Sequence, residues 1–155
     1  YGGHAAAAGL SLESTKLASF TAALCAHAAA HLSPEQMVRE LAYDFPVEAT
    51  ELTPAAVVEL GRLAPFGHSN PTPTLRLNGL RVIESPRLMG KPASHISIRV
   101  SDGSRVLRLV GWRKSSWADH LAKGMVIDAI VHPKLNEWQG RKQIEPEVLD
   151  LRLDR

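Results

Sequence analysis

Apolar residues recur with two different periods along this chain of 155 residues. In residues 13–31 they return every three or four positions, as at Leu17, Phe20, Leu24 and Ala28, in a segment rich in alanine. This spacing is typical of one face of a helix. The pattern predicts a helix over 13–31, with Ser11 or Ser14 as its N-cap.

Two shorter helices are predicted where a hydroxyl residue precedes a proline. Ser33 and Pro34 begin the first, which Gln36 supports by completing a capping box, and it runs to about Tyr43. After an extended segment at 45–49, Thr53 and Pro54 begin the second, which runs to about Leu63. The first half of the chain is therefore predicted to be helical.

From residue 74 the period changes to the alternation that marks half-buried strands. The predicted strands are 74–84, 95–101, 105–112, 125–132 and 142–153, with a tight turn at 102–104 and one short helix at 115–122. Five strands with a helix between the third and the fourth match the oligonucleotide-binding (OB) barrel, and a small sandwich is the alternative. Residues 64–73 are too rich in Pro and Gly for regular structure and predict a fixed turn that packs Phe66. The predicted fold class is α+β, a helical segment followed by a five-stranded OB barrel.

Composition narrows the class of protein further. Hydrophobic residues make up 45% and charged residues 22% of the chain, which is typical of a soluble globular protein. No apolar run approaches the roughly 18 residues that cross a bilayer, so we expect no membrane contact.

Cys25 is the single cysteine, which excludes an intrachain disulfide and a multi-cysteine zinc site and fits a cytoplasmic location. Because the chain starts at Tyr1 without a signal segment, we expect it to be a piece of a longer protein.

The net charge of +2 hides an asymmetry between the two halves. Residues 1–61 contain two basic and seven acidic side chains, whereas residues 62–155 contain sixteen basic and nine acidic ones. The second half alone therefore has the charge expected of a polyanion-binding protein, although a basic surface also serves solubility.

Basic side chains in that half are interleaved with tryptophan and histidine. This combination holds single-stranded nucleic acid, because cations follow the phosphates and flat rings stack on the bases. Arg105 and Arg108 belong to the same pattern, while Trp112 and Trp138 are equally compatible with a place in the core. The predicted DNA-binding residues are Lys91, His95, Arg99, Trp112, Arg113, Lys114, Lys134, Trp138, Arg141 and Lys142.

Two further patterns invite a chemical interpretation. Gly2, Gly3 and His4 offer consecutive backbone N–H groups and a ring donor to an anion, although a plain glycine-rich end gives the same sequence. His27 and His31 lie one helical turn apart, but the glutamate of a zinc-protease helix and a third ligand are missing. We therefore expect no metal site in this chain.

Residues 2–10 (GGHAAAAGL) and 63–73 (LAPFGHSNPTP) resemble the RecJ family of single-strand-specific exonucleases, within the DHH phosphoesterase superfamily. The family's glycine-lysine-x-histidine stretch is matched at 90–95, and its N-x-W-x-G element at 136–140, with Asp150 after it. The resemblance runs through the whole chain in order. It implies that residues 1–31 are the end of a DHH-associated domain, 32–73 connecting helices and a junction, and 74–155 an OB domain that binds single-stranded DNA.

The same resemblance implies that this is the C-terminal part of a 5′-to-3′ exonuclease. Its Mg²⁺ or Mn²⁺ ions would be bound by a catalytic domain outside this chain, because the Asp-His-His motif is missing, so we expect this part to be inactive alone. Gly2, Gly3 and His4 would contact a substrate phosphate, and further partners would be a single-strand-binding protein or a helicase. The alternatives are a protein-docking OB module and a phosphodiesterase of small nucleotides.

Two positions depart from the family pattern. Ser69 stands where the family usually has a second glycine, and we expect this serine to alter the turn of residues 64–73 without abolishing it. Pro146 lies inside the last predicted strand, where it cannot donate a ladder hydrogen bond. We expect that strand to be an edge or to be interrupted there.

Overall fold

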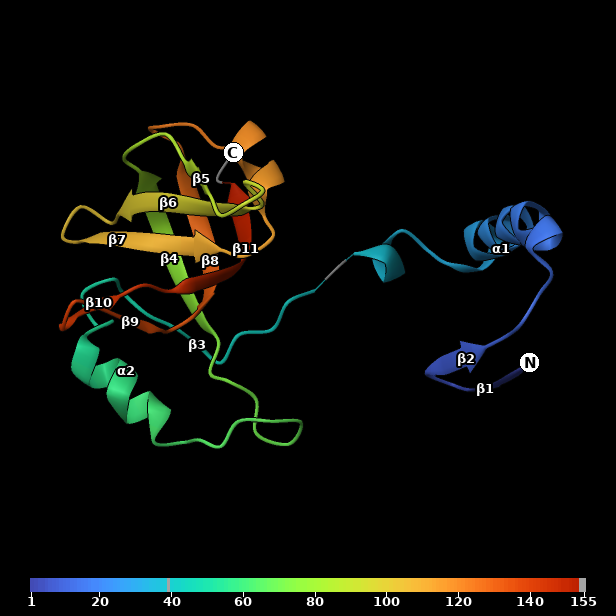
Figure 1. The fold of residues 1–155 in the computed structure, drawn as a ribbon, viewed down its shortest axis with the longest axis horizontal. Coiled ribbons are helices and arrows are strands. Elements are labelled where there is room, and N and C mark those ends of the chain that lie inside the picture. The colour runs from blue at the N-terminus through green and yellow to red at the C-terminus, as the bar shows by residue number, and fades with distance from the viewer. Residues whose placement is uncertain (39, 154–155) are drawn as a thin grey trace. The chain divides into compact units, whose positions relative to one another are not determined.

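The computed structural model describes residues 1–38 and 40–153, apart from the side chain of Trp138. The chain forms two compact units, Tyr1–Glu40 and Leu41–Arg155 (Figure 1). Of the helices described in either unit, none combines the length and the apolar content that crossing a bilayer requires. The domain boundaries expected after residues 31 and 73 stay a prediction.

The first unit contains a small hairpin and one long helix. Strand β1 (Gly2–His4) pairs antiparallel with β2 (Ala7–Gly9), and a 3₁₀ turn, η1 (Ser14–Lys16), leads into α1 (Leu17–His31). The predicted helix is confirmed, but its predicted cap is wrong. Ser14 lies inside the 3₁₀ turn, and Lys16 takes the N-cap position without a side-chain hydrogen bond to the helix.

The second predicted helix is much shorter than expected. The N–H of Ser33 donates to Gln36 Oε1 at 2.9 Å, so half of the capping box forms. In the described part of this segment, which leaves out residue 39, only one 3₁₀ turn, η2 (Glu35–Met37), follows, and Val38 is already extended. Met37 and Val38 remain largely exposed, so a longer helix would bury no apolar face there.

The second unit is a closed barrel of five strands. Its strands are β4 (Leu75–Val82), β6 (His95–Ser101), β7 (Val106–Gly111), β8 (Val126–His132) and β11 (Glu147–Leu153). They pair in the order β4–β8–β11–β7–β6, and β6 returns to β4. Only the β7–β11 pairing among these is parallel. A short helix, η3 (Ser115–Asp119), separates the third barrel strand from the fourth, so the predicted OB topology is confirmed.

Two elements precede the barrel within the second unit. Strand β3 (Phe45–Pro46) pairs parallel with β4, in the segment predicted to be extended. Helix α2 (Pro54–Gly61) follows, and Thr53 Oγ1 accepts a hydrogen bond from the N–H of Ala56 at 3.1 Å. The predicted cap and helix are confirmed here, because the helix also buries Val57 against the barrel core.

The barrel interior is filled by alternate residues of its strands. Ile96, Ile98 and Val100 of β6 are fully buried, as are Ile127 and Val131 of β8. The polar residues between them face outward, which confirms the alternation predicted for β6. The inward side chains form one hydrophobic cluster that includes residues of all five strands.

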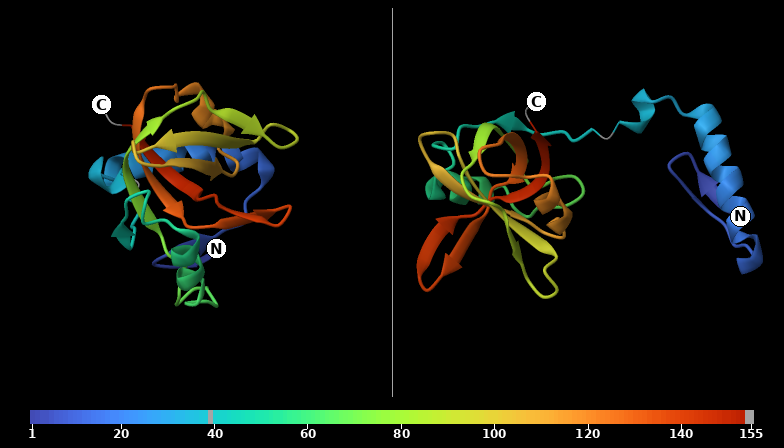
Figure 2. Two further views of the ribbon diagram at one scale, coloured as in Figure 1. Left: turned by 90° about the vertical axis from the view of Figure 1, so that its left-hand side faces the viewer. Right: turned by 90° about the horizontal axis from the view of Figure 1, so that it is seen from above.

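Two hairpins that the sequence analysis did not predict extend from the barrel. Strand β5 (Arg87–Met89) pairs with β6, and we call residues 83–94 the β5 arm. Strands β9 (Leu135–Trp138) and β10 (Arg141–Ile144) pair with each other, and we call residues 133–146 the β10 arm. Both arms project from the same side of the barrel (Figure 2).

The predicted last strand is divided in two. Residues 142–153 do not form one strand, because β10 ends at Ile144 and β11 begins at Glu147. The interruption expected at Pro146 is therefore confirmed. At the tip of the β10 arm, Gln139 and Gly140 have φ values of 50° and 73°, the pattern of a type I′ turn.

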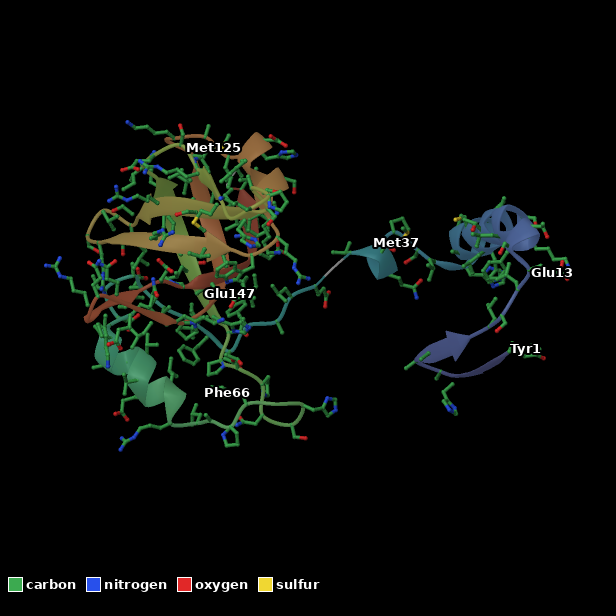
Figure 3. The ribbon with its side chains drawn as sticks, viewed as in Figure 1. Tyr1, Glu13, Met37, Phe66, Met125 and Glu147 are labelled. Carbon is green, nitrogen blue, oxygen red and sulfur yellow. The ribbon has the colours of Figure 1, made fainter. Side chains whose placement is uncertain are left out.

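The turn after α2 is held by one asparagine. The side-chain amide of Asn70 donates to the carbonyl oxygens of Leu63 and Pro65, at 2.8 and 3.0 Å. Phe66, which belongs to this loop, is half-buried (Figure 3). Ser69 does not have a positive φ, so a residue other than glycine fits there. Hydrogen bonds thus hold the turn predicted within residues 64–73, while the packing of Phe66 in it stays a prediction.

A single carboxylate links three barrel strands on their outer side. Asp128 of β8 accepts hydrogen bonds from Arg76 of β4 at 2.9 Å, from Arg152 of β11 at 2.6 Å and from the N–H of Gly79 at 3.0 Å. Burial alone would raise the pKa of the Asp128 carboxyl, but these donors outweigh it and lower the pKa below its usual value. The ionised carboxylate therefore stabilises the fold above about pH 4, and this stabilisation is lost as the pH falls through the lower folded pKa.

We predict that Asp128→Ala lowers the free energy of unfolding by about 2 kcal/mol, because two guanidiniums and one N–H lose their acceptor. Urea denaturation followed by tryptophan fluorescence measures this, since all three tryptophans lie in the second unit. The control is Glu59→Ala, which removes an ion pair with Arg62 that is exposed on both sides. It should cost less than about 0.5 kcal/mol. Equal losses in the two variants would contradict the prediction.

Candidate nucleic-acid interface

Strands β6 and β7 present a polar outer face. The hairpin between them places Arg99 directly opposite Arg108, as Cα partners in the register. The turn that sets this register is held by Asp102, whose Oδ1 accepts hydrogen bonds from the side chain and N–H of Ser104 and from the N–H of Arg105. The bond from the Ser104 side chain and those from the backbone lower the pKa of Asp102 to about 2. The carboxylate thus stays ionised and keeps the two arginines in register.

The β6–β7 face is the floor of a groove with one arm on each side. A hollow of about 400 Å³ lies between the β5 arm and the floor, and Arg87 and Met89 contribute to its lining. A second hollow of about 380 Å³ lies between the floor and β10, where Lys142 contributes. Arg99 and Arg108 line both hollows. We call the two hollows together the groove, and the arms on either side of it are seen in Figure 2.

Arg108 contacts both arms and the floor. Its Nε donates to Ser97 Oγ at 2.9 Å, and its Nη2 lies 2.9 Å from the Met89 sulfur in the β5 arm. Its Nη1 forms an ion pair with Glu145 in the β10 arm. The contact with Arg108 also explains why Ser97 is buried although it points to the outer face of β6. All three nitrogen atoms of the guanidinium therefore have a partner, which fixes the guanidinium in the middle of the groove.

An exposed tryptophan lies where β6 begins and β7 ends. The side chain of Trp112 is half exposed, and its ring meets His95 edge-to-face, with the ring centroids 4.8 Å apart. The N–H of Arg113 donates to His95 Nδ1 at 2.9 Å, and this bond orients the imidazole ring. A Cβ on Gly90 would lie 3.0 Å from His95 Cδ2, and Gly90 has a φ of +82°. Glycine at this position lets the β5 arm pass close to the ring.

The other predicted cations have different surroundings. Lys91 is exposed in the β5 arm, and Arg141 is exposed on β10. The ammonium of Lys114 lies 4.5 Å from the ring centroid of Trp117, so this lysine packs on η3. Lys134 forms an ion pair with Glu147, at the start of β11.

The structure thus brings only part of the predicted set together. Arg99 and Lys142 line the groove, and His95, Trp112 and Arg113 form a cluster at the ends of its floor strands. Lys114 and Lys134 are engaged elsewhere, and the side chain of Trp138 lies outside the described residues.

Sequence reasoning missed the central position of Arg108. Counting outward from the turn at 102–104 would have found it, because that register pairs residue 99 with residue 108. It also missed Glu84 and Glu145, since acidic residues are not expected in a site for a polyanion. The ion pairs of Glu84 with Arg99 and of Glu145 with Arg108 join residues 15 and 37 positions apart.

The glycine-glycine-histidine motif forms strand β1 of the first unit. Gly2, Gly3 and His4 are all exposed. A Cβ on Gly3 would lie 2.8 Å from the Cβ of Ala8 on the facing strand. The need for glycine at position 3 therefore comes from the hairpin itself. A phosphate contact by these three residues stays a prediction.

The described residues contain no group of three His, Cys, Asp or Glu side chains arranged to hold a metal ion. His27 and His31 stack with their ring centroids 4.0 Å apart, and His31 Nδ1 lies 2.8 Å from the carbonyl oxygen of His27. The donor set needed for Mg²⁺ or Mn²⁺, oxygen ligands converging on one point, is not assembled by the described part of the chain.

Comparisons with known proteins agree with the fold of the second unit. The model of the family described as "RecJ OB domain" matches residues 43–150. Two curated relatives are both named "Single-stranded-DNA-specific exonuclease RecJ". The one from Thermus thermophilus is 30% identical over 152 residues, which are 98% of this chain and 21% of that protein. The one from Bacillus subtilis is 26% identical over 150 residues, 97% of this chain and 19% of that protein.

A solved structure gives the same result. The crystal structure of RecJ from Thermus thermophilus in complex with Mn²⁺ has a TM-score of 0.64 and 26% identity, and the match covers 93% of this chain and 20% of that one. A second structure of that protein, in complex with Mg²⁺, has a TM-score of 0.62. The chain spans about a fifth of the length of these relatives. Because the family model matches more than half of its residues, the chain belongs to the RecJ family, whose OB domain it contains.

Proposed function

We propose that the second unit binds single-stranded DNA in the groove between the β5 arm and the β10 arm. The observation that carries the proposal is the arrangement of Arg99 and Arg108 on the groove floor, with the exposed ring of Trp112 at its end. Guanidiniums bind phosphodiester groups in a planar, bidentate manner, and an exposed indole offers a stacking surface to any base. A duplex has its bases stacked inside, so a site that stacks on bases favours the single strand.

The groove serves, in this proposal, to hold the substrate strand of a RecJ-type exonuclease. The relatives that share this family are named for that activity, and two of their structures contain Mn²⁺ or Mg²⁺. The metal ions and the water that they activate would belong to a part of the enzyme outside the described residues, so this chain would bind the strand without cleaving it. Gly2, Gly3 and His4 would contact a phosphate near that centre, as the motif resemblance implies. The described part of this chain contains no contact that indicates binding to a single-strand-binding protein or a helicase.

A protein-docking role has one observation in its favour. A hollow of about 410 Å³ lies between α2 and the β3–β4 pair, and it is lined largely by apolar side chains such as Phe45, Leu60 and Leu63. Apolar surface of this kind is typical of contacts with protein. The hollow and the groove have no lining residue in common, so docking there would leave the groove free for DNA.

The proposed function predicts that the 155-residue chain binds a labelled oligothymidylate of about 16 nucleotides, the upper end of OB-domain site sizes. Its affinity should fall as salt rises, with a log–log slope of about −0.7 for each phosphate contact. Fluorescence anisotropy at several salt concentrations measures this, with a duplex of equal length as the competitor. An affinity that does not change with the salt concentration, or that is equal for duplex and single strand, would refute the proposal.

Stacking on Trp112 predicts a second result. Trp112→Ala should weaken binding by about 1–3 kcal/mol, the usual contribution of one base stacked on an aromatic ring. The matched control is Phe45→Ala, because Phe45 has a similar exposure (43% against 50%) but lies outside the groove. Anisotropy titrations of both variants, with circular dichroism to verify the fold, give the comparison. If Trp112→Ala binds as the wild type does, the ring has no part in binding.

A further inference from the structure

The two arginines of the groove floor are both neutralised by carboxylates from the arms. Glu84, in the β5 arm, forms an ion pair with Arg99, and Glu145, in the β10 arm, forms one with Arg108. The two glutamates thus lie on opposite sides of the same groove. Two guanidiniums that face each other across neighbouring strands would otherwise repel each other. These two arginines and two glutamates therefore carry four charges that sum to zero.

The carboxylates occupy the place that a phosphodiester would take. A carboxylate and a phosphate present similar oxygen pairs to a guanidinium, and both form charge-assisted hydrogen bonds with it. The Glu145 side chain is only 18% exposed and the Glu84 side chain 35% exposed, so the two acids are seated in the groove wall rather than in open solvent. A phosphate that binds the Nη1 group of Arg99 or Arg108 must first displace the carboxylate that is bonded there.

We propose that Glu84 and Glu145 are affinity-setting residues that compete with the phosphates of single-stranded DNA for Arg99 and Arg108. This inference rests on the proposed function, since it names the groups that regulate binding in the same groove. Binding exchanges each carboxylate–guanidinium pair for a phosphate–guanidinium pair, and the freed carboxylate returns to water with its own counterion. The two carboxylates keep the guanidiniums ordered in the groove, and they also lower the affinity for the strand. The lower affinity allows the strand to move along the groove.

The two sides of the groove differ in a way that the test can use. Arg108 is also held by Ser97 and by the Met89 sulfur, so its guanidinium stays in place when Glu145 leaves. Glu84 binds Arg87 at 3.3 Å in addition to Arg99, so its removal frees two cations at once. Removal of Glu145 therefore exposes a preorganised phosphate site, whereas removal of Glu84 exposes a looser one.

The experiment measures binding of the labelled oligothymidylate to the 155-residue chain and its variants Glu145→Gln and Glu84→Gln. Each variant should bind about 2- to 5-fold more tightly than the wild type, which is the range expected for the loss of one partly exposed ion pair. The salt slope should become steeper by about 0.7 in Glu145→Gln. In this variant the phosphate that binds Arg108 releases its counterion, and no freed carboxylate takes one up in exchange. The charge-matched control is Glu59→Gln, whose partner Arg62 follows α2 and lines neither hollow, and its affinity should change less than about 1.5-fold.

A second pair of variants tests the assignment to Arg108. In the Arg108→Gln background, adding Glu145→Gln should no longer tighten binding, because the contested guanidinium is gone. The inference would be overturned if both Glu145→Gln and Glu84→Gln, each in an otherwise wild-type chain, bound the oligonucleotide as tightly as the wild type or more weakly. It would also be overturned if Glu59→Gln raised the affinity by the same factor as they do. A wild-type chain that does not bind the oligonucleotide at all would refute the proposed function as well. Circular dichroism of each variant verifies that the barrel is intact.

Discussion

The groove depends on the closure of the barrel between β7 and β11. These strands meet in a short parallel pairing at Val110 and Glu147, and the N–H of Val110 donates to the carbonyl oxygen of Pro146 at 2.9 Å. Pro146 has no N–H and cannot continue the ladder of the preceding strand, so the chain leaves the β10 arm at this point and enters the barrel. The residue before it, Glu145, is thereby placed beside Arg108. One backbone contact thus fixes the position of an arm relative to the floor.

Charge on the floor is then organised around Arg108, which touches the floor and both arms. A guanidinium bonded to Ser97, Met89 and Glu145 has little rotational freedom, and preorganisation of this kind lowers the entropy cost of binding a phosphate. The same contacts give the arms a common point of attachment across the groove. Arg108 therefore both stabilises the groove and is preorganised to bind an anion. The neighbouring carboxylates weaken its attraction for the strand.

The sequence predicted those parts of the fold that local rules decide. The alternation of Ile96, Ile98 and Val100, the cap at Thr53 and the break at Pro146 each follow from chemistry within a few residues. The helix expected after Ser33 failed although half of its capping box formed, because helix length depends on burial that a capping motif does not supply.

The arms and the site were harder to predict. Strands β5, β9 and β10 are short and largely exposed, so no apolar alternation marks them in the sequence. Of the seven predicted lysines and arginines, Arg99 and Lys142 line the groove and Arg113 lies at the end of its floor. Lys114 and Lys134 instead contact Trp117 and Glu147, which composition cannot show. Glu84 and Glu145 could be found only in three dimensions, because the barrel brings them to arginines far away along the chain.

The most direct test of the central claim is to locate a bound strand on the barrel by NMR. In ¹H–¹⁵N spectra of the 155-residue chain, the guanidinium Nε–H signals of Arg99 and Arg108 and the indole N–H of Trp112 report on the groove. Titration with single-stranded oligothymidylate should shift all three signals together and saturate them at the same concentration. If these signals stay unchanged while residues around α2 or in the first unit shift, the strand binds elsewhere and the groove is not its site.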